Sequence, residues 1–274
     1  MAVTITSSII LLICVLFGYE ISYRLGLRKF LRADVLLEKE VVDTLQPAVL
    51  GLFALLIGFT FSMALDRFSQ RRDLILHESN AIGTAYLRAD FLSKNDSIRV
   101  KNIFRKYVQN RIELYNAGAD KTNNINLVTQ ADQLQSEIWS LISKSDLAER
   151  NSDLHALVVE SVNEVIDLAG ARTANMVGQI PKEVLLLLNL FAVASFGVLG
   201  YRQAFTGTRA LVSSIIYMLL ISTVIYVILD LSRPKSGLIK SGQSPMLLLN
   251  NSINNQALES GLFGVTEKEE QKLH

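Results

Sequence analysis

Four long runs of apolar residues constrain the fold of this chain more than any other feature of its sequence. They cover residues 3–20, 47–65, 184–201 and 210–229, and charged side chains are almost absent from them. A helix of about 20 apolar residues spans the roughly 30 Å hydrocarbon core of a bilayer. The sequence therefore predicts an all-α integral membrane protein with four transmembrane helices.

The order of these runs predicts two helical hairpins in the membrane. Positive charges follow the first run instead of preceding it, which is the reverse of a signal peptide, so we expect a retained helix. Pro47 suits the first turn of the second helix, because the N–H that proline lacks would have no partner there. The connection between the third and fourth runs, 202–209, is short enough to force a hairpin.

The rest of the chain is polar and is expected to form helices outside the membrane. The predicted parts are a first transmembrane pair in 1–65, an extramembrane helical domain in 66–182, a second transmembrane pair in 183–230 and a polar C-terminal segment in 231–274. Within the domain, apolar residues recur at intervals of three and four, as from Leu127 to Leu141, with a break expected within 116–126. The tail after Leu249 is polar and is expected to fray.

Charge is unevenly distributed inside the predicted helical domain. Residues 94–111 contain six basic side chains and one acid, whereas 132–167 contain eight acids and two basic side chains. A basic helix that faces acidic helices would explain this pattern. Independent solvated faces would explain it equally well, because charge runs are common on helix surfaces.

A set of polar residues, here called the polar lane, follows one face of the second predicted transmembrane helix and continues beyond it. Its members are three or four residues apart, close to one helical turn. They are Ser62, Asp66, Gln70, Asp73, His77, Asn80 and Thr84. A polar face that begins inside a membrane needs water or polar partners, which copies of the helix around a symmetry axis would supply. Alternatively, Ser62 bonds to its own helix, Asp66 pairs with Arg67 or Arg71, and the other side chains face solvent.

Two further charged sets lie at the predicted membrane edges. Arg67, Arg71 and Arg72 form a basic cluster, which would either attract anions to the mouth of the lane or anchor the chain to lipid headgroups. Asp230 and Arg233 bracket the end of the fourth helix. We expect these two residues to form an ion pair, with the alternative that Asp230 reaches the polar lane.

Two segments around these residues carry a resemblance to a known family. The first is 58–68 (GFTFSMALDRF), which continues through Arg71 and Arg72 to 78–89 (ESNAIGTAYLRA), and the second is 229–239 (LDLSRPKSGLI). Together they resemble the signatures of the bestrophin-like domain family of bacterial and plant membrane proteins. The chain departs from that pattern at Ser232, where the family usually has an acidic residue.

The resemblance implies a similarity to bestrophins, which are pentameric anion channels with four transmembrane helices and a helical extramembrane domain. Fold similarity alone does not settle function. The chain has no clear counterpart of the aromatic-rich bestrophin neck. Phe59 and Phe61 are the nearest candidates for a hydrophobic constriction, with lipid contact or packing as the alternative.

The sequence contains no recognisable catalytic or cofactor motif. It has no phosphate-binding glycine loop, no paired-histidine zinc motif and no nucleophile elbow, and its three histidines are scattered. The single cysteine, Cys14, excludes a disulfide or a cysteine-based metal site within one chain. We therefore expect no enzyme activity, cofactor or metal. The net charge of +1 gives no reason to expect a nucleic-acid partner.

The side of the membrane on which the helical domain lies is left open by the placement of basic residues. Those in 24–32, after the first run, argue for an external domain, whereas those in 67–72 and 233–240 argue for a cytoplasmic one, as does the resemblance. Because the resemblance favours a bacterial protein, we expect a multi-pass protein of the bacterial inner membrane.

Two functional hypotheses follow from these observations. The first is a homo-oligomeric ion channel in contact with membrane lipid, with an inorganic anion as the candidate permeant ion and the second transmembrane helix lining the path. The alternative is a non-conducting membrane scaffold or sensor whose helical domain binds a protein partner.

Overall fold

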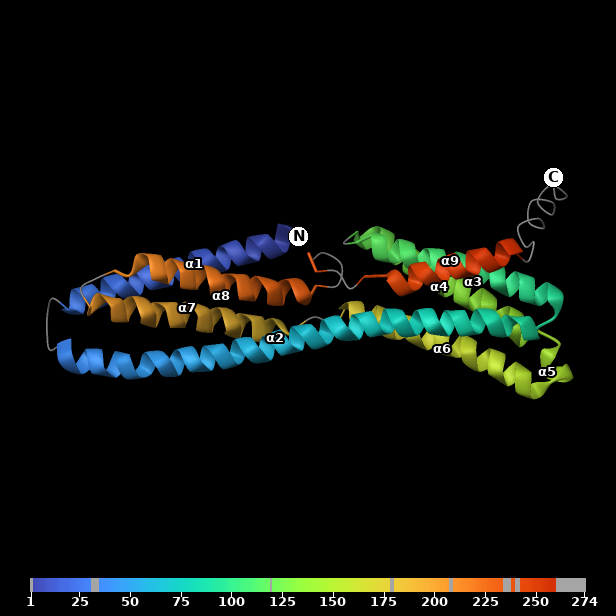
Figure 1. Ribbon diagram of the computed structural model, residues 1–274, viewed down its shortest axis with the longest axis horizontal. Helices are drawn as coiled ribbons and strands as arrows, with labels where there is room; N and C mark the ends of the chain where they lie inside the picture. Colours follow the sequence, from blue (N-terminus) through green and yellow to red (C-terminus); the bar gives the residue numbers. More distant parts are fainter. Residues whose placement is uncertain are drawn as a thin grey trace. The chain divides into compact units, whose positions relative to one another are not determined.

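The computed structural model describes residues 2–30, 35–118, 120–177, 180–206, 209–233, 238–239 and 242–259. These segments are α-helical almost throughout, and none of them forms a β-strand (Figure 1). The helices are α1 (Ala2–Phe30), α2 (Val35–Arg88), α3 (Lys94–Asn116), α4 (Lys121–Ser143), α5 (Leu147–Arg150), α6 (Ser152–Val177), α7 (Lys182–Ala204), α8 (Leu211–Leu231) and α9 (Ser244–Glu259), with a 3-10 helix, η1 (Ala89–Phe91), after α2. Stretches of α1, α2, α7 and α8 are long and apolar enough to cross a membrane, so the predicted all-α fold with four spans is confirmed.

The helices pack into two compact units, which are described separately. The membrane unit comprises Met1–Phe68 and Gln179–Lys240, and the helical unit comprises Ser69–Gly178 and Ser241–His274. Helix α2 belongs to both, because its residues up to Phe68 lie in the membrane unit and the remainder lies in the helical unit.

The membrane unit is held together by close packing between α1, α7 and α8. Its buried core includes Val15 of α1, Phe196 of α7 and Ile228 of α8. Glycines allow α1 and α7 to approach each other closely: a Cβ atom added at Gly26 would lie 2.8 Å from the Cβ of Ala204. Small residues serve this purpose in membrane proteins, where helix association depends on van der Waals contact more than on exclusion of water.

Polar contacts connect the helices at one end of the membrane unit. Arg202 of α7 pairs with Asp43 of α2 at 2.6 Å, and the guanidinium of Arg209 lies 3.9 Å from the ring centroid of Tyr23 of α1. Nearby, the hydroxyl of Tyr19 donates to Gln203 at 2.6 Å. Charged and aromatic side chains favour the water interface of a bilayer, so these contacts mark one edge of the membrane-spanning segments.

The helical unit has its own apolar core, to which α2, α3, α4, α5, α6 and α9 all contribute. Tyr86 of α2, Phe104 of α3, Ile138 of α4, Val162 of α6 and Met246 of α9 are all buried in it. The expectation that the chain frays after Leu249 differs from the structure, because α9 continues to Glu259. The reason is that Ile253 and Ala257, one turn apart among the polar residues, are both buried.

Three helix boundaries also differ from the sequence-based expectation. Pro47 lies inside α2 instead of in its first turn, since the helix begins at Val35. Helix α1 continues beyond its apolar run to Phe30, and α2 continues beyond Leu65 to Arg88. Charged residues are excluded from hydrocarbon but not from helices, so an apolar run marks the span and not the ends of the helix.

The break within 116–126 is shorter than predicted, because α3 ends at Asn116 and α4 begins at Lys121. The carboxylate of Asp120 accepts hydrogen bonds from the backbone N–H groups of Thr122 and Asn123, at 3.1 Å each. This N-cap satisfies donors that the first helical turn would otherwise leave unpaired, which draws the asparagine-rich segment into α4.

Candidate functional site

The polar lane lies on a single unbroken helix, since all seven of its residues belong to α2. At about 100° of rotation per residue, these side chains leave the helix axis within an arc of about 80°. All seven are exposed to the surroundings of the protomer. Each unit therefore leaves its own part of this face of α2 uncovered.

Two of the local pairings that would account for the lane without any partner do not occur in the described part of the chain. There, the hydroxyl of Ser62 forms no hydrogen bond to its own helix, and Asp66 forms no ion pair with Arg67. The neighbouring Thr60 shows the alternative arrangement, in which a hydroxyl donates to the carbonyl four residues earlier, Leu56, at 2.7 Å. Ser62 and Asp66 thus depend on water or on another molecule for their hydrogen bonds.

The same face of α2 is apolar within the membrane-spanning part. Leu52, Leu55 and Phe59 share the angular position of the lane and are 57 %, 55 % and 66 % exposed. Phe61, the other aromatic candidate from the sequence, leaves the helix about 140° away from the centre of the lane. The structure therefore distinguishes the two phenylalanines, because only Phe59 continues the exposed face.

The three arginines of the basic cluster, Arg67, Arg71 and Arg72, differ in their burial. Arg71 is buried, Arg67 is half-buried and Arg72 is exposed. Because of their spacing along α2, all three leave the helix about 100° or more from the centre of the polar lane. The lane itself carries the two carboxylates of Asp66 and Asp73 and no arginine.

The opposite face of α2 carries a buried ionic network that the sequence did not reveal. Both oxygens of the fully buried Glu78 carboxylate are bound: Oε1 by Nε of Arg111 at 2.7 Å and Oε2 by Nη1 of Arg172 at 2.6 Å. The hydroxyl of Tyr107 donates to Oε1 at 3.2 Å and accepts from the side-chain amide of Gln135 at 3.0 Å. The network therefore joins α2 to α3, α4 and α6.

This network sets the rotation of α2 within the helical unit. Glu78 leaves the helix about 120° from the centre of the polar lane, so a buried Glu78 directs the lane away from the core. Glu78 lies beyond the apolar part of α2. Burial alone would raise the pKa of its carboxyl group, but Arg111 and Arg172 outweigh that effect and hold the pKa below its ordinary value. The carboxylate is therefore charged at neutral pH and keeps both arginines paired.

Asp230, at the end of α8, has different partners from the one predicted. Its two carboxylate oxygens accept hydrogen bonds from the backbone N–H groups of Leu238 and Ile239, at 3.0 and 2.9 Å. Among the described residues, it forms no ion pair with Arg233 and makes no contact with the polar lane. The buried carboxylate thus fastens the chain that follows α8.

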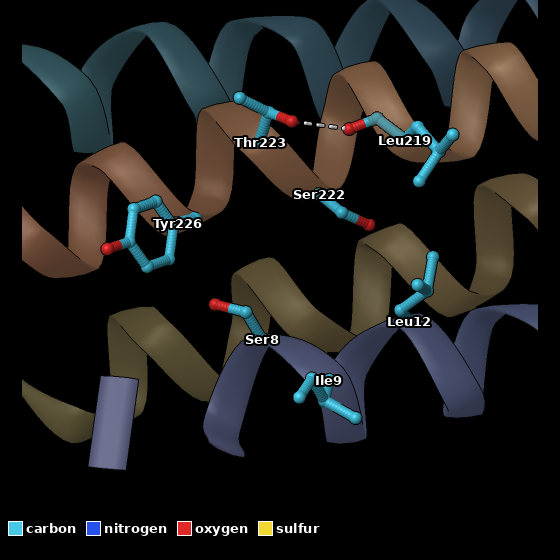
Figure 2. A pocket seen from close by; sticks show the side chains of 7 residues that line it. All are labelled: Ser8, Ile9, Leu12, Leu219, Ser222, Thr223 and Tyr226. Atoms are coloured by element: carbon cyan, nitrogen blue, oxygen red, sulfur yellow. Dashed lines mark hydrogen bonds between the residues drawn. The ribbon is translucent and has the colours of Figure 1, made fainter. Parts of the chain in front are cut away.

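A shallow pocket lies between α1 and α8 in the membrane unit (Figure 2). Leucine and isoleucine side chains share its lining with hydroxyl groups, one of which, on Thr223, donates to the carbonyl of Leu219 at 2.8 Å. Its position on membrane-spanning helices suits contact with lipid. No group of three or more histidine, cysteine, aspartate or glutamate side chains that could bind a metal ion occurs in the described segments.

Comparisons with known proteins agree with this architecture. The family model described as "Bestrophin-like domain" matches residues 3–246. A bacterial bestrophin homologue from Klebsiella pneumoniae, whose crystal structure was phased with zinc, superposes with a TM-score of 0.61 at 14 % identity, over 93 % of this chain and 97 % of that one. A single-residue variant of the Klebsiella homologue gives a TM-score of 0.54 at 13 % identity, over 93 % and 98 % of the two chains. No curated protein matches significantly.

Proposed function

The chain belongs to the bestrophin-like family, and from this premise we propose that it is a homo-oligomeric ion channel of the bacterial inner membrane in which the α2 helices line the conducting path. The observation that carries the proposal is the uncovered face of α2, which is polar from Ser62 to Thr84 and continues as an apolar face into the membrane. Copies of α2 around an axis would give that face the water and the neighbours that it lacks in one protomer.

The charge of the polar lane argues for cations as the preferred ions. Rings of carboxylates are typical of cation pathways. Asp66 and Asp73 would form two such rings, and no arginine shares their face. An inorganic anion was the candidate permeant ion predicted from the sequence, with Arg67, Arg71 and Arg72 balancing the charge of Asp66. Since these arginines leave α2 in other directions, anion preference becomes the alternative outcome of the test.

The apolar part of the same face would form the narrowest, driest section of the path. Leu52, Leu55 and Phe59 would each contribute one side chain per subunit. Hydrophobic constrictions close channels by expelling water. Phe59 is the largest of the three and lies next to the polar lane, so it is the residue at which we place the constriction.

The ion preference is tested by replacing Asp66 in the purified protein reconstituted in planar bilayers. With a tenfold gradient of potassium chloride, the reversal potential of the wild type should be shifted from zero toward the equilibrium potential of potassium. Asp66→Asn should shift the reversal potential toward the equilibrium potential of chloride, because one ring of negative charge is removed. Glu137→Gln, which removes an exposed carboxylate from α4, is the matched control and should leave the potential unchanged.

Two results would contradict the channel proposal. One is the absence of current across salts, pH values and voltages, which would favour the scaffold or sensor function. The other is a monomeric mass by light scattering in detergent, because one protomer cannot surround a path with its own α2.

A further inference from the structure

Helices α9 and α6 flank α2 on opposite sides of the polar lane within the helical unit. On one side, the hydroxyl of Ser79 donates to the carbonyl of Pro245 at 3.0 Å. On the other side, Glu78, which leaves α2 about 120° from the centre of the lane, is bound by Nη1 of Arg172 of α6 at 2.6 Å. A ring of subunits whose lanes face the axis would therefore place α6 of one subunit beside α9 of the next.

The outer surface of α6 is acidic. Glu160, Glu164 and Asp167 are exposed and lie on one face of the helix, since they are spaced by four and three residues. Like charges at this spacing repel one another and destabilise the helix, so a positively charged neighbour would stabilise this face. Within the described part of the protomer, neither Glu160 nor Glu164 forms an ion pair.

The outer surface formed by α3 and α9 is basic and contains a pocket of complementary character. The pocket is lined by Asn102, Arg105, Lys106, Gln109 and Asn254. These side chains provide two cationic groups and three amides, and no carboxylate lines the pocket. Nε of Arg105 donates to Oδ1 of Asn254 at 3.2 Å, which connects the two helices across the pocket. Carboxylates are the natural ligands of such a set of donors.

Exposed leucines lie next to this pocket on α9. Leu247 and Leu258 share one face of α9 and are 43 % and 63 % exposed, and Leu248, about 100° further round the helix, is 69 % exposed. Apolar side chains that gather on one face of a soluble helix are typical of a surface that another protein covers. The α3–α9 surface thus combines an apolar strip with a basic pocket, as interfaces between subunits commonly do.

We infer that the acidic face of α6 in one subunit docks against the basic pocket of α3 and α9 in the next subunit, with Glu160 and Glu164 directed at Arg105 and Lys106. This inference rests on the proposed homo-oligomer and names the contact that closes it. The two faces belong to the same chain, have opposite charge and lie on opposite sides of the lane. Because the two faces differ, the contact is head-to-tail, and a head-to-tail contact generates a ring when the rotation between successive subunits closes.

The contact is tested by cysteine cross-linking of the full-length protein, with Cys14→Ser removing the native cysteine. Oxidation of a variant carrying both Glu160→Cys and Lys106→Cys should give a ladder of covalent multimers, because each subunit then presents one thiol on each face. Variants with only Glu160→Cys or only Lys106→Cys should give no ladder. A variant with Glu137→Cys and Lys106→Cys is the matched control and should also remain uncross-linked.

Charge reversal gives an independent test. Glu160→Lys combined with Glu164→Lys should weaken assembly, and so should Arg105→Glu combined with Lys106→Glu. The four changes together should restore the wild-type mass in light scattering, because the two faces are complementary again. Helical content measured by circular dichroism should be the same in all three variants.

The outcomes separate this inference from the channel proposal. If the protein is oligomeric but gives no ladder, the inference is wrong and the channel proposal still stands. The basic pocket would then be available to a different acidic ligand. A ladder from a protein that conducts no ions supports the inference and contradicts the channel. A monomeric mass with no ladder contradicts both.

Discussion

Glu78 is central to the helical unit, because its carboxylate is the shared ionic partner of two buried arginines, Arg111 and Arg172. Removing one partner from a buried ion pair typically costs about 3–5 kcal/mol, since an uncompensated charge remains. We predict that Glu78→Gln lowers the free energy of unfolding by about that amount, measured by denaturant unfolding in detergent. Glu113→Gln removes an exposed carboxylate from α3, and its effect should stay within about 0.5 kcal/mol.

The same carboxylate makes stability depend on pH in a defined direction. The folded-state pKa of Glu78 lies below its ordinary value of 4.5. Its contribution to stability is therefore fully present above pH 4.5 and is lost as the pH falls through the lower, folded-state pKa. We predict that the difference in Tm between wild type and Glu78→Gln is constant near neutral pH and narrows below pH 4.5. A difference that widens on acidification would contradict this assignment.

The positions of some residues could be predicted from the sequence, and those of others could not. The polar lane was predictable because its residues are one turn apart on one helix, and helical periodicity alone places them on one face. The partners of Glu78 were not predictable, because Arg111 and Arg172 lie 33 and 94 residues away. Tertiary packing brings these groups together, and neither spacing nor composition records it.

At the scale of helices, the contact between α1 and α7 requires glycine. A Cβ atom at Gly200 would overlap the backbone oxygen of Tyr19. Their separation would be shorter than any that real Cβ atoms normally show. Gly200→Ala should force the helices apart and cost about 1–3 kcal/mol, as overpacking commonly does. Thermal unfolding in detergent measures this effect. Gly51→Ala, where a Cβ meets nothing within 4 Å, should leave stability unchanged or raise it slightly.

The membrane spans were predictable from the sequence, whereas several helix ends were not. Apolar runs located all four spans, because the bilayer selects for apolar length. They did not locate the ends of α1 and α2, which continue through charged residues, or the C-terminal helix α9. Helix α9 is rich in asparagine and buries only a few of its side chains. The apolar residues against which it packs belong to α2 and α3, so its own sequence does not predict it.

At the scale of the whole molecule, one protomer leaves a long face of α2 uncovered, and the proposed ring of subunits covers it. The most direct test of this account is whether that face is in contact with the permeating ions. In a Cys14→Ser background, Gln70→Cys places a thiol in the middle of the polar lane, and Ser136→Cys places one on the exposed surface of α4.

The decisive measurement is the single-channel current of these two variants before and after addition of a positively charged methanethiosulfonate reagent. The account predicts that modification of Gln70→Cys reduces the current and that modification of Ser136→Cys does not. An unchanged current through Gln70→Cys channels that mass spectrometry shows to be fully labelled would mean that α2 does not line the path.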